Sequence, residues 1–169
     1  METMDMERTG DRNEKGPGTD YRILVNRVRV LMEKQRFYVT NLANASAAIW
    51  EALPRINWAG FYLRLGDELW LGPFQGKPAC TKIPFGKGVC GTAAEQDRIQ
   101  LVPDVEQFPG HIACDSASRS EIVIPIHQNG RVVGVLDMDS PEKDRFSPED
   151  REGLSALVRV LEETTDFPD

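Results

Sequence analysis

The chain has 169 residues and 40% of them are hydrophobic, so it is long enough for one substantial core, and a second independent domain is not expected. Its 20 basic and 27 acidic residues give a net charge of −7, which argues against nucleic acid and anionic membranes as partners. The first residues have no apolar signal segment, and no later apolar run reaches membrane-spanning length, so we expect a cytoplasmic protein.

The N-terminal part divides into a tail and two helices. Residues 1–19 are polar and contain glycine and proline, which predicts a mobile tail ahead of a single domain over residues 20–169. Apolar residues then recur at helical spacing over residues 21–35 and again over residues 39–53. Pro54 follows the second run and ends it, so we predict two packing helices.

The middle of the chain alternates short strands and loops. Residues 57–65 and 68–76 are rich in strand-forming residues on either side of a Gly-Asp turn, which predicts a hairpin. Residues 83–91 form a glycine-rich loop that leads into a short helix. We then predict a short strand within residues 99–104 and a long polar connection over residues 105–120.

Residues 121–139 give the strongest hairpin signal in the chain, with an Asn-Gly pair at the turn. A two-residue turn would pair Ile122 with Asp137 and so mix a core residue with an acid. A three-residue loop over residues 128–130 would instead pair Glu121 with Asp137 and keep each face uniform. We therefore predict the three-residue loop.

With that loop the two faces of the hairpin differ in character. One face is apolar and suited to packing against helices: Ile122, Ile124, Ile126, Val132, Gly134, Leu136 and Met138. The other face carries three valines, Val123, Val133 and Val135, and ends in three acids, Glu121, Asp137 and Asp139. Acids at strand ends are also common on solvated surfaces, so the cluster alone does not distinguish a site from an ordinary strand end.

The C-terminal part is a helix with a clear start signal. Ser147 is its expected cap, Pro148 its first residue, and its apolar face holds Leu154, Leu157, Val158 and Leu161. The order of elements predicts an α+β architecture, in which helices cover one face of a mainly antiparallel sheet of about five or six strands.

The cysteines are the chemically reactive residues of the chain. An odd number, three, argues against a permanent disulfide framework. Cys90 precedes a helix whose dipole favours a thiolate, which ranks it level with Cys114 of the polar connection as a nucleophile. For Cys80, ahead of a strand, an exposed thiol without a role stays an open alternative. The Cys-x9-Cys and His-x2-Cys spacings that include His111 do not match zinc motifs, so we expect no metal.

Four segments carry a resemblance to a known family: NWAGFYL (57–63), IPFGKGVCGTAA (83–94), HIACDSASRSEIVIPI (111–126) and GVLDMDSPEKDRFSPED (134–150). Together they resemble the GAF-domain free methionine-(R)-sulfoxide reductases over residues 21–163. The placement of the three cysteines makes the resemblance specific. It implies a six-stranded antiparallel sheet with helices packed on one face and a ligand pocket on the other.

The resemblance also implies a thiol relay that acts on free L-methionine-(R)-sulfoxide without a cofactor. Cys114 matches the catalytic cysteine, whose thiolate attacks the sulfoxide sulfur, releases methionine and becomes a sulfenic acid. Cys90 matches the resolving cysteine that condenses with this sulfenic acid to a disulfide. Cys80 matches the third cysteine, which exchanges with that disulfide and passes it towards thioredoxin.

The substrate pocket follows from the same resemblance. Glu121, Asp137 and Asp139 match its acids, and Trp58 matches the aromatic wall beside the substrate methyl group. The helix start in the glycine-rich loop, with Gly88 and Val89, offers backbone N–H groups for a substrate carboxylate. Crowding of the acids should raise the pKa of at least one carboxyl, as a general acid requires, and Glu121 and Asp139 are the catalytic candidates.

Two points remain open on the sequence. The alternative function is that of a non-catalytic GAF domain that binds a ligand as a sensor. An aromatic residue such as Trp58 is also common as a packing residue of the hydrophobic core. The oligomeric state does not follow from the sequence, and a homodimer is one option.

Overall fold

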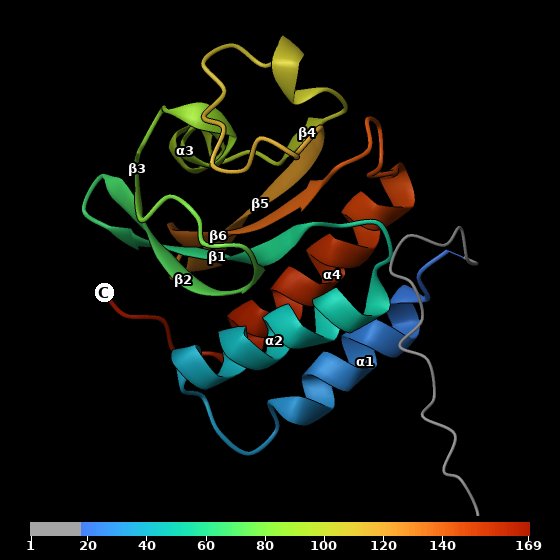
Figure 1. Ribbon diagram of the computed structural model, residues 1–169. Helices are drawn as coiled ribbons and strands as arrows, with labels where there is room; N and C mark the ends of the chain where they lie inside the picture. Colours follow the sequence, from blue (N-terminus) through green and yellow to red (C-terminus); the bar gives the residue numbers. More distant parts are fainter. Residues whose placement is uncertain (1–17) are drawn as a thin grey trace, which may run out of the picture.

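The computed structural model describes residues 18–169, so almost all of the expected tail, residues 1–19, lies outside the described residues (Figure 1). The elements follow the predicted order: α1 (Tyr21–Leu31), α2 (Tyr38–Ala52), β1 (Trp58–Leu65), β2 (Glu68–Gly76), β3 (Lys82–Pro84), α3 (Gly88–Gln96), β4 (Gln100–Val102), the 3-10 helix η1 (Val105–Gln107), β5 (Ser120–Gln128), β6 (Arg131–Ser140) and α4 (Pro148–Thr164).

The first helix ends four residues earlier than predicted, at Leu31. The chain beyond it turns to meet the C-terminal segment, where Phe37 forms a parallel bridge with Asp166. The Asp166 N–H donates to the carbonyl of Arg36 at 2.9 Å. At the end of the helix the backbone N–H groups donate to carbonyls three residues back, so the last turn tightens and the helix closes although the apolar spacing continues.

A single six-stranded sheet forms the centre of the molecule, in the order β3-β2-β1-β6-β5-β4. Every neighbouring pair in it is antiparallel, as predicted. Helices α1, α2 and α4 lie together on one side of this sheet (Figure 1). Of these, α2 contacts β1 and β2, α4 contacts β5, and α1 packs on both helices. None of the helices within residues 18–169 is long and apolar enough to cross a membrane.

The predicted cap of the last helix is present. The Ser147 hydroxyl accepts the Asp150 N–H at 3.1 Å, and the Asp150 carboxylate accepts the Ser147 N–H at 2.8 Å. Buried Arg145 adds an ion pair to the same carboxylate at 3.0 Å. This capping box sets where α4 begins and thereby which of its faces meets the sheet.

Helix α3 lies on the opposite face of the sheet from the other three helices (Figure 1). The predicted layers are present, with three helices on one face, and α3 is a further helix on the pocket face. Its short side chains, among them Val89, Ala93 and Ala94, pack against Val123 and Val135 of the sheet. Because these valines alternate with the residues that face α2 and α4, both faces of β5 and β6 are buried.

The predicted three-residue loop between β5 and β6 is wrong. Asn129 and Gly130 both have left-handed backbone, with φ of 53° and 73°, and Gln128 pairs with Arg131. This is a two-residue turn, whose twist matches that of the flanking strands. The two turn residues thus determine the pairing next to the turn. A two-residue turn continued without interruption would pair Ile122 with Asp137, and this mismatch is removed further along the hairpin.

The mismatch is removed by a β-bulge, because the register shifts by one residue between Ile126 and His127. Beyond the shift Glu121 pairs with Asp139, so the predicted pairing of Glu121 with Asp137 is also wrong. The three acids nevertheless share one face, as predicted. Because of the bulge, two valines lie on the opposite faces from those predicted. Val132 packs on the α3 side and Val133 on the side of the three helices.

Candidate active site

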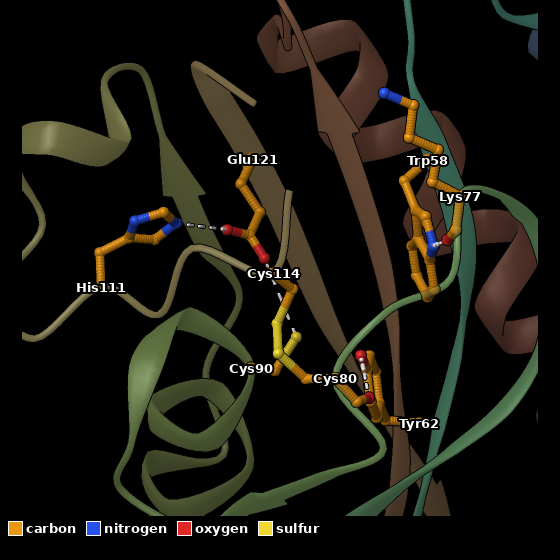
Figure 2. The surroundings of a disulfide bond; sticks show 8 residues. All are labelled: Trp58, Tyr62, Lys77, Cys80, Cys90, His111, Cys114 and Glu121. Carbon is orange, nitrogen blue, oxygen red and sulfur yellow. Dashed lines mark hydrogen bonds and ion pairs between the residues drawn. A yellow bond between two sulfur atoms is a disulfide. The ribbon is translucent and has the colours of Figure 1, made fainter. Parts of the chain in front are cut away.

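A cavity lies between the α3 side of the sheet and the loops that cover it. All of the residues that the sequence singled out line this cavity except Cys80: Trp58, Gly88, Val89, Cys90, Cys114, Glu121, Asp137 and Asp139. Cys80 lies at its edge, bonded to Cys114 (Figure 2). The fold thus brings together one strand of the first hairpin, the start of α3, the polar connection and the acidic end of the last hairpin.

Two of the three cysteines form a disulfide. Cys80 and Cys114 are 34 residues apart in the sequence, and their Cα atoms are 5.5 Å apart. The Tyr62 hydroxyl donates to the carbonyl of Cys80 at 2.9 Å and anchors that segment to β1. Cys90, which the resemblance paired with Cys114, is instead a buried free thiol in this state.

Cys90 lies in the first turn of α3, as predicted, but its surroundings oppose a thiolate. Burial raises the pKa of this thiol well above its ordinary value, and the nearby Asp137 and Glu121 raise it further. A helix dipole contributes only about 0.3–1 kcal/mol, which is small against the loss of solvation of a buried charge. The prediction that Cys90 ranks level with Cys114 as a nucleophile is therefore corrected.

The three acids form the floor of the cavity. Glu121 and Asp137 are each only 6% exposed, and burial raises the pKa of Glu121 and Asp139 well above the usual carboxyl range. Burial also raises the pKa of Asp137, to about 6. The predicted effect of crowding is thus present, although burial is its larger cause. Near neutral pH this cluster holds protons that solvated carboxyls would have lost.

His111 and Lys87 are the basic side chains on the cavity lining. His111 Nε2 is 3.9 Å from Glu121 Oε2, and burial lowers the pKa of this imidazole, which favours its neutral form. Lys87 is exposed at the N-cap of α3. The acids therefore lack a buried positive partner among the residues that line the cavity, and a bound cation would be attracted there.

One wall of the cavity is aromatic. Trp58 stacks on Tyr62 and on Phe74, with ring centroids 5.8 and 5.2 Å apart, and its indole N–H donates to the Lys77 carbonyl at 3.1 Å (Figure 2). Sequence reasoning missed Tyr62. The period of two along β1 carried the signal, since Trp58 and Tyr62 are four residues apart and share a face.

A second missed residue is Asn57, which immediately precedes β1. Its side-chain amide donates to Asp115 Oδ2 and to the Ser118 hydroxyl, both at 3.2 Å. Its backbone N–H donates to the carbonyl of Asp139 at 3.0 Å. Asn57 thus ties the loop that carries Cys114 to the acidic end of β6. Only the three-dimensional arrangement reveals this, because a lone asparagine before a strand has no distinctive pattern.

A disulfide, a buried thiol and three protonatable carboxyls around one cavity define a thiol-redox domain that binds a small ligand. The sequence comparisons agree. The GAF domain model matches residues 21–164. The free methionine-R-sulfoxide reductase of Escherichia coli is 52% identical over 140 residues, which cover 81% of this chain and 85% of that protein. The protein of the same name from Saccharomyces cerevisiae is 48% identical over 145 residues, or 81% of each chain.

A solved structure gives the same result. The free methionine-R-sulfoxide reductase from Neisseria meningitidis, in complex with its substrate, superposes with a TM-score of 0.82 at 44% identity. The match covers 85% of this chain and 87% of that one. This chain therefore belongs to the GAF-domain family of free methionine-(R)-sulfoxide reductases, as the resemblance implied.

Proposed function

We propose that this protein is an oxidoreductase that converts free L-methionine-(R)-sulfoxide to L-methionine. The observation that carries the proposal is the meeting of the Cys80–Cys114 disulfide, the Cys90 thiol and three buried carboxyls around one cavity. The names of its relatives from Escherichia coli and Saccharomyces cerevisiae support the same activity.

The first step uses the reduced enzyme. The Cys114 thiolate attacks the sulfoxide sulfur, a proton is added to the sulfoxide oxygen, and the oxygen passes to Cys114 as methionine leaves. Cys114 is then a sulfenic acid, and methionine carries the two electrons that the thiolate supplied. Glu121 and Asp139 are the candidate proton donors, because burial raises their pKa well above the usual carboxyl range and so favours the protonated form.

The relay then removes the sulfenic acid. Cys90 condenses with it, which forms a Cys90–Cys114 disulfide and releases water. Cys80 attacks that bond at Cys114, which leaves a Cys80–Cys114 disulfide and a free Cys90 thiol. The present arrangement, in which Cys80 and Cys114 are bonded and Cys90 is free, supports this order as the end of the relay. Thioredoxin, a dithiol, would restore the reduced enzyme by exchange.

The pocket suits the two charged ends of a free amino acid. We assign the substrate ammonium group to the cluster of Glu121, Asp137 and Asp139, whose ionised members hold it while a protonated Glu121 or Asp139 serves the sulfoxide oxygen. We assign the substrate methyl group to the wall at Trp58. The N–H groups of Gly88 and Val89 open α3, whose N-terminus has no side-chain cap, and they are suited to a carboxylate. A peptide-bound sulfoxide lacks both free ends.

The test measures methionine formed from each free sulfoxide epimer and from a peptide-bound sulfoxide, with excess dithiothreitol. We expect turnover of the free (R) epimer alone, and Cys114→Ser should abolish it. Cys90→Ser should keep the first turnover and lose thioredoxin-coupled cycling. Full activity of Cys114→Ser would refute its role. A tight ligand complex with no turnover would favour the sensor alternative.

The physiological setting is part of the same proposal. We place the enzyme in the cytoplasm with thioredoxin as its reductant, and the three-cysteine relay supports a dithiol partner. A homodimer would cover Ile23 and Val30, which are 68% and 55% exposed and lie seven residues apart on α1. Sedimentation of the wild type and of Ile23→Ser tests the dimer, because a polar side chain there should shift the protein to monomer.

A further inference from the structure

The cavity contains three side-chain atoms that could serve as ligands of a metal ion. The sulfur of Cys90, a carboxylate oxygen of Glu121 and a carboxylate oxygen of Asp137 all lie within 4.8 Å of one another. They come from α3, β5 and β6, and all three residues are buried. Sequence spacings typical of zinc sites do not reveal these three residues, because only the fold brings them together.

An unsatisfied atom points to a missing partner. Asp137 Oδ1 is buried without a hydrogen-bond partner in the described part of the chain, and Asp137 as a whole is 6% exposed. A buried carboxylate oxygen normally has a donor or a cation beside it. The basic side chains on the lining do not serve, since Lys87 is exposed and His111 faces Glu121 on its other oxygen.

We propose that Cys90, Glu121 and Asp137 form a binding site for Zn²⁺ in the disulfide state of the enzyme. A thiolate and a carboxylate oxygen on one tetrahedral zinc lie about 3.6 Å apart, given their usual bond lengths. Cys90 Sγ and Glu121 Oε1 are 3.9 Å apart, so a small side-chain rotation closes the site. Mg²⁺ and Ca²⁺ are disfavoured because a thiolate is a poor ligand for them.

Binding exchanges protons for the metal and transfers no electrons. One Zn–S and two Zn–O bonds form, and the protons held by the thiol and the carboxyls pass to solvent, so affinity should rise with pH. The fourth position stays open to water. Cys80 and Cys114 cannot compete for the ion while they are bonded to each other. If the proposed function is correct, the ion occupies, in the disulfide state, the place that the substrate ammonium group takes in the reduced enzyme.

Cobalt is the probe, because a thiolate on Co²⁺ gives a charge-transfer absorption that carboxylates do not. The protein is first oxidised until thiol titration finds one thiol, and peptide mapping after alkylation identifies this thiol as Cys90. We expect one equivalent of Co²⁺ to produce the absorption and one equivalent of Zn²⁺ to remove it. Cys90→Ser should abolish the absorption, and Glu121→Gln and Asp137→Asn should each weaken binding by about a hundredfold.

The matched control is Glu106→Gln, which removes an exposed acid on η1 paired with Arg119 and should leave metal binding unchanged. Melting curves confirm that each variant is folded. The proposal is overturned if wild-type protein shows no charge-transfer absorption with Co²⁺, or if both carboxylate variants retain it at wild-type affinity. Because these readouts are spectroscopic, they succeed or fail independently of sulfoxide reduction.

Discussion

Adjacent aromatic residues of β1 show how differently the two faces of the sheet are built. Phe61 is fully buried on the face of α1, α2 and α4, within a cluster of hydrophobic side chains. Tyr62 is 1% exposed on the other face, where its hydroxyl meets the Cys80 carbonyl and its ring meets Trp58. Both are equally hidden from water, yet one face packs mainly hydrophobic side chains and the other carries carboxyls, thiols and a cavity.

Burial therefore serves two purposes in this domain. Burial of apolar groups on the helix face stabilises the fold by about 25 cal/mol per Å². Burial of Glu121 and Asp137 on the cavity face opposes folding whenever these groups ionise, and it is this penalty that raises their pKa. The helix face supplies the stability that lets the cavity face keep unfavourable groups.

The largest expected effect tests the helix face. Phe61→Ala should lower the free energy of unfolding by about 3–5 kcal/mol, because it removes a fully buried ring from a closely packed core. Urea denaturation measures the change, and Phe61→Leu provides a milder variant if the alanine protein does not fold. Leu65→Ala, at a position 62% exposed, is the control and should be nearly neutral. A loss below 1 kcal/mol for Phe61→Ala would contradict the comparison.

The next effect concerns the disulfide on the cavity face. Reduction of the Cys80–Cys114 bond, which spans 34 residues, should lower the free energy of unfolding by about 3–4 kcal/mol through the entropy of the unfolded chain. Denaturation with and without dithiothreitol measures it. In the Cys80→Ser, Cys114→Ser double variant the reductant should have no effect, and a persisting effect there would point to another cause.

A pH-dependent effect follows from Asp137. Burial raises its pKa from 3.8 to about 6, so the protonated carboxyl favours the fold below about pH 4 and this contribution is lost as the pH rises through 6. Relative to Asp137→Asn, the wild type should lose about 3 kcal/mol at most between pH 4 and 7. Urea denaturation at several pH values measures the difference, and parallel curves would show that Asp137 titrates normally.

The smallest effect isolates one polar contact of the cavity face. Tyr62→Phe keeps the ring and removes the hydroxyl that donates to the Cys80 carbonyl at 2.9 Å. A single hydrogen bond contributes about 1 kcal/mol, so the loss of stability should be a fraction of that for Phe61→Ala. If Tyr62→Phe proves as damaging as Phe61→Ala, the stability of the domain does not depend mainly on the helix face.

Local chemistry made much of the fold predictable. The Ser147 cap, the Asn129-Gly130 turn and the period of two along the hairpins are short-range signals, and they placed the helix start, the strands and the acidic face correctly. The register failed because two local signals disagreed, and a bulge near His127 accommodated both. The alternation of apolar and polar residues along a strand does not show where a bulge inserts an extra residue.

The site was less predictable where it depends on long-range surroundings. The position of Cys90 at a helix start was visible, but its raised pKa depends on burial and on acids from other strands. The partnership of Cys80 with Cys114 and the clamp by Asn57 likewise join segments distant in the sequence. Residue types identified the chemistry, and only the folded arrangement assigned partners.

The Cys80–Cys114 bond closes a covalent ring in the polypeptide. The ring contains β3, the whole of α3 with Cys90, and β4, so it includes both edge strands of the sheet. A single protease cut at its exposed Ile112 or Ala113 would therefore leave two fragments still joined, which would separate only on reduction. The electrophoretic mobility of nicked protein would thus report how much of the enzyme is in the disulfide state.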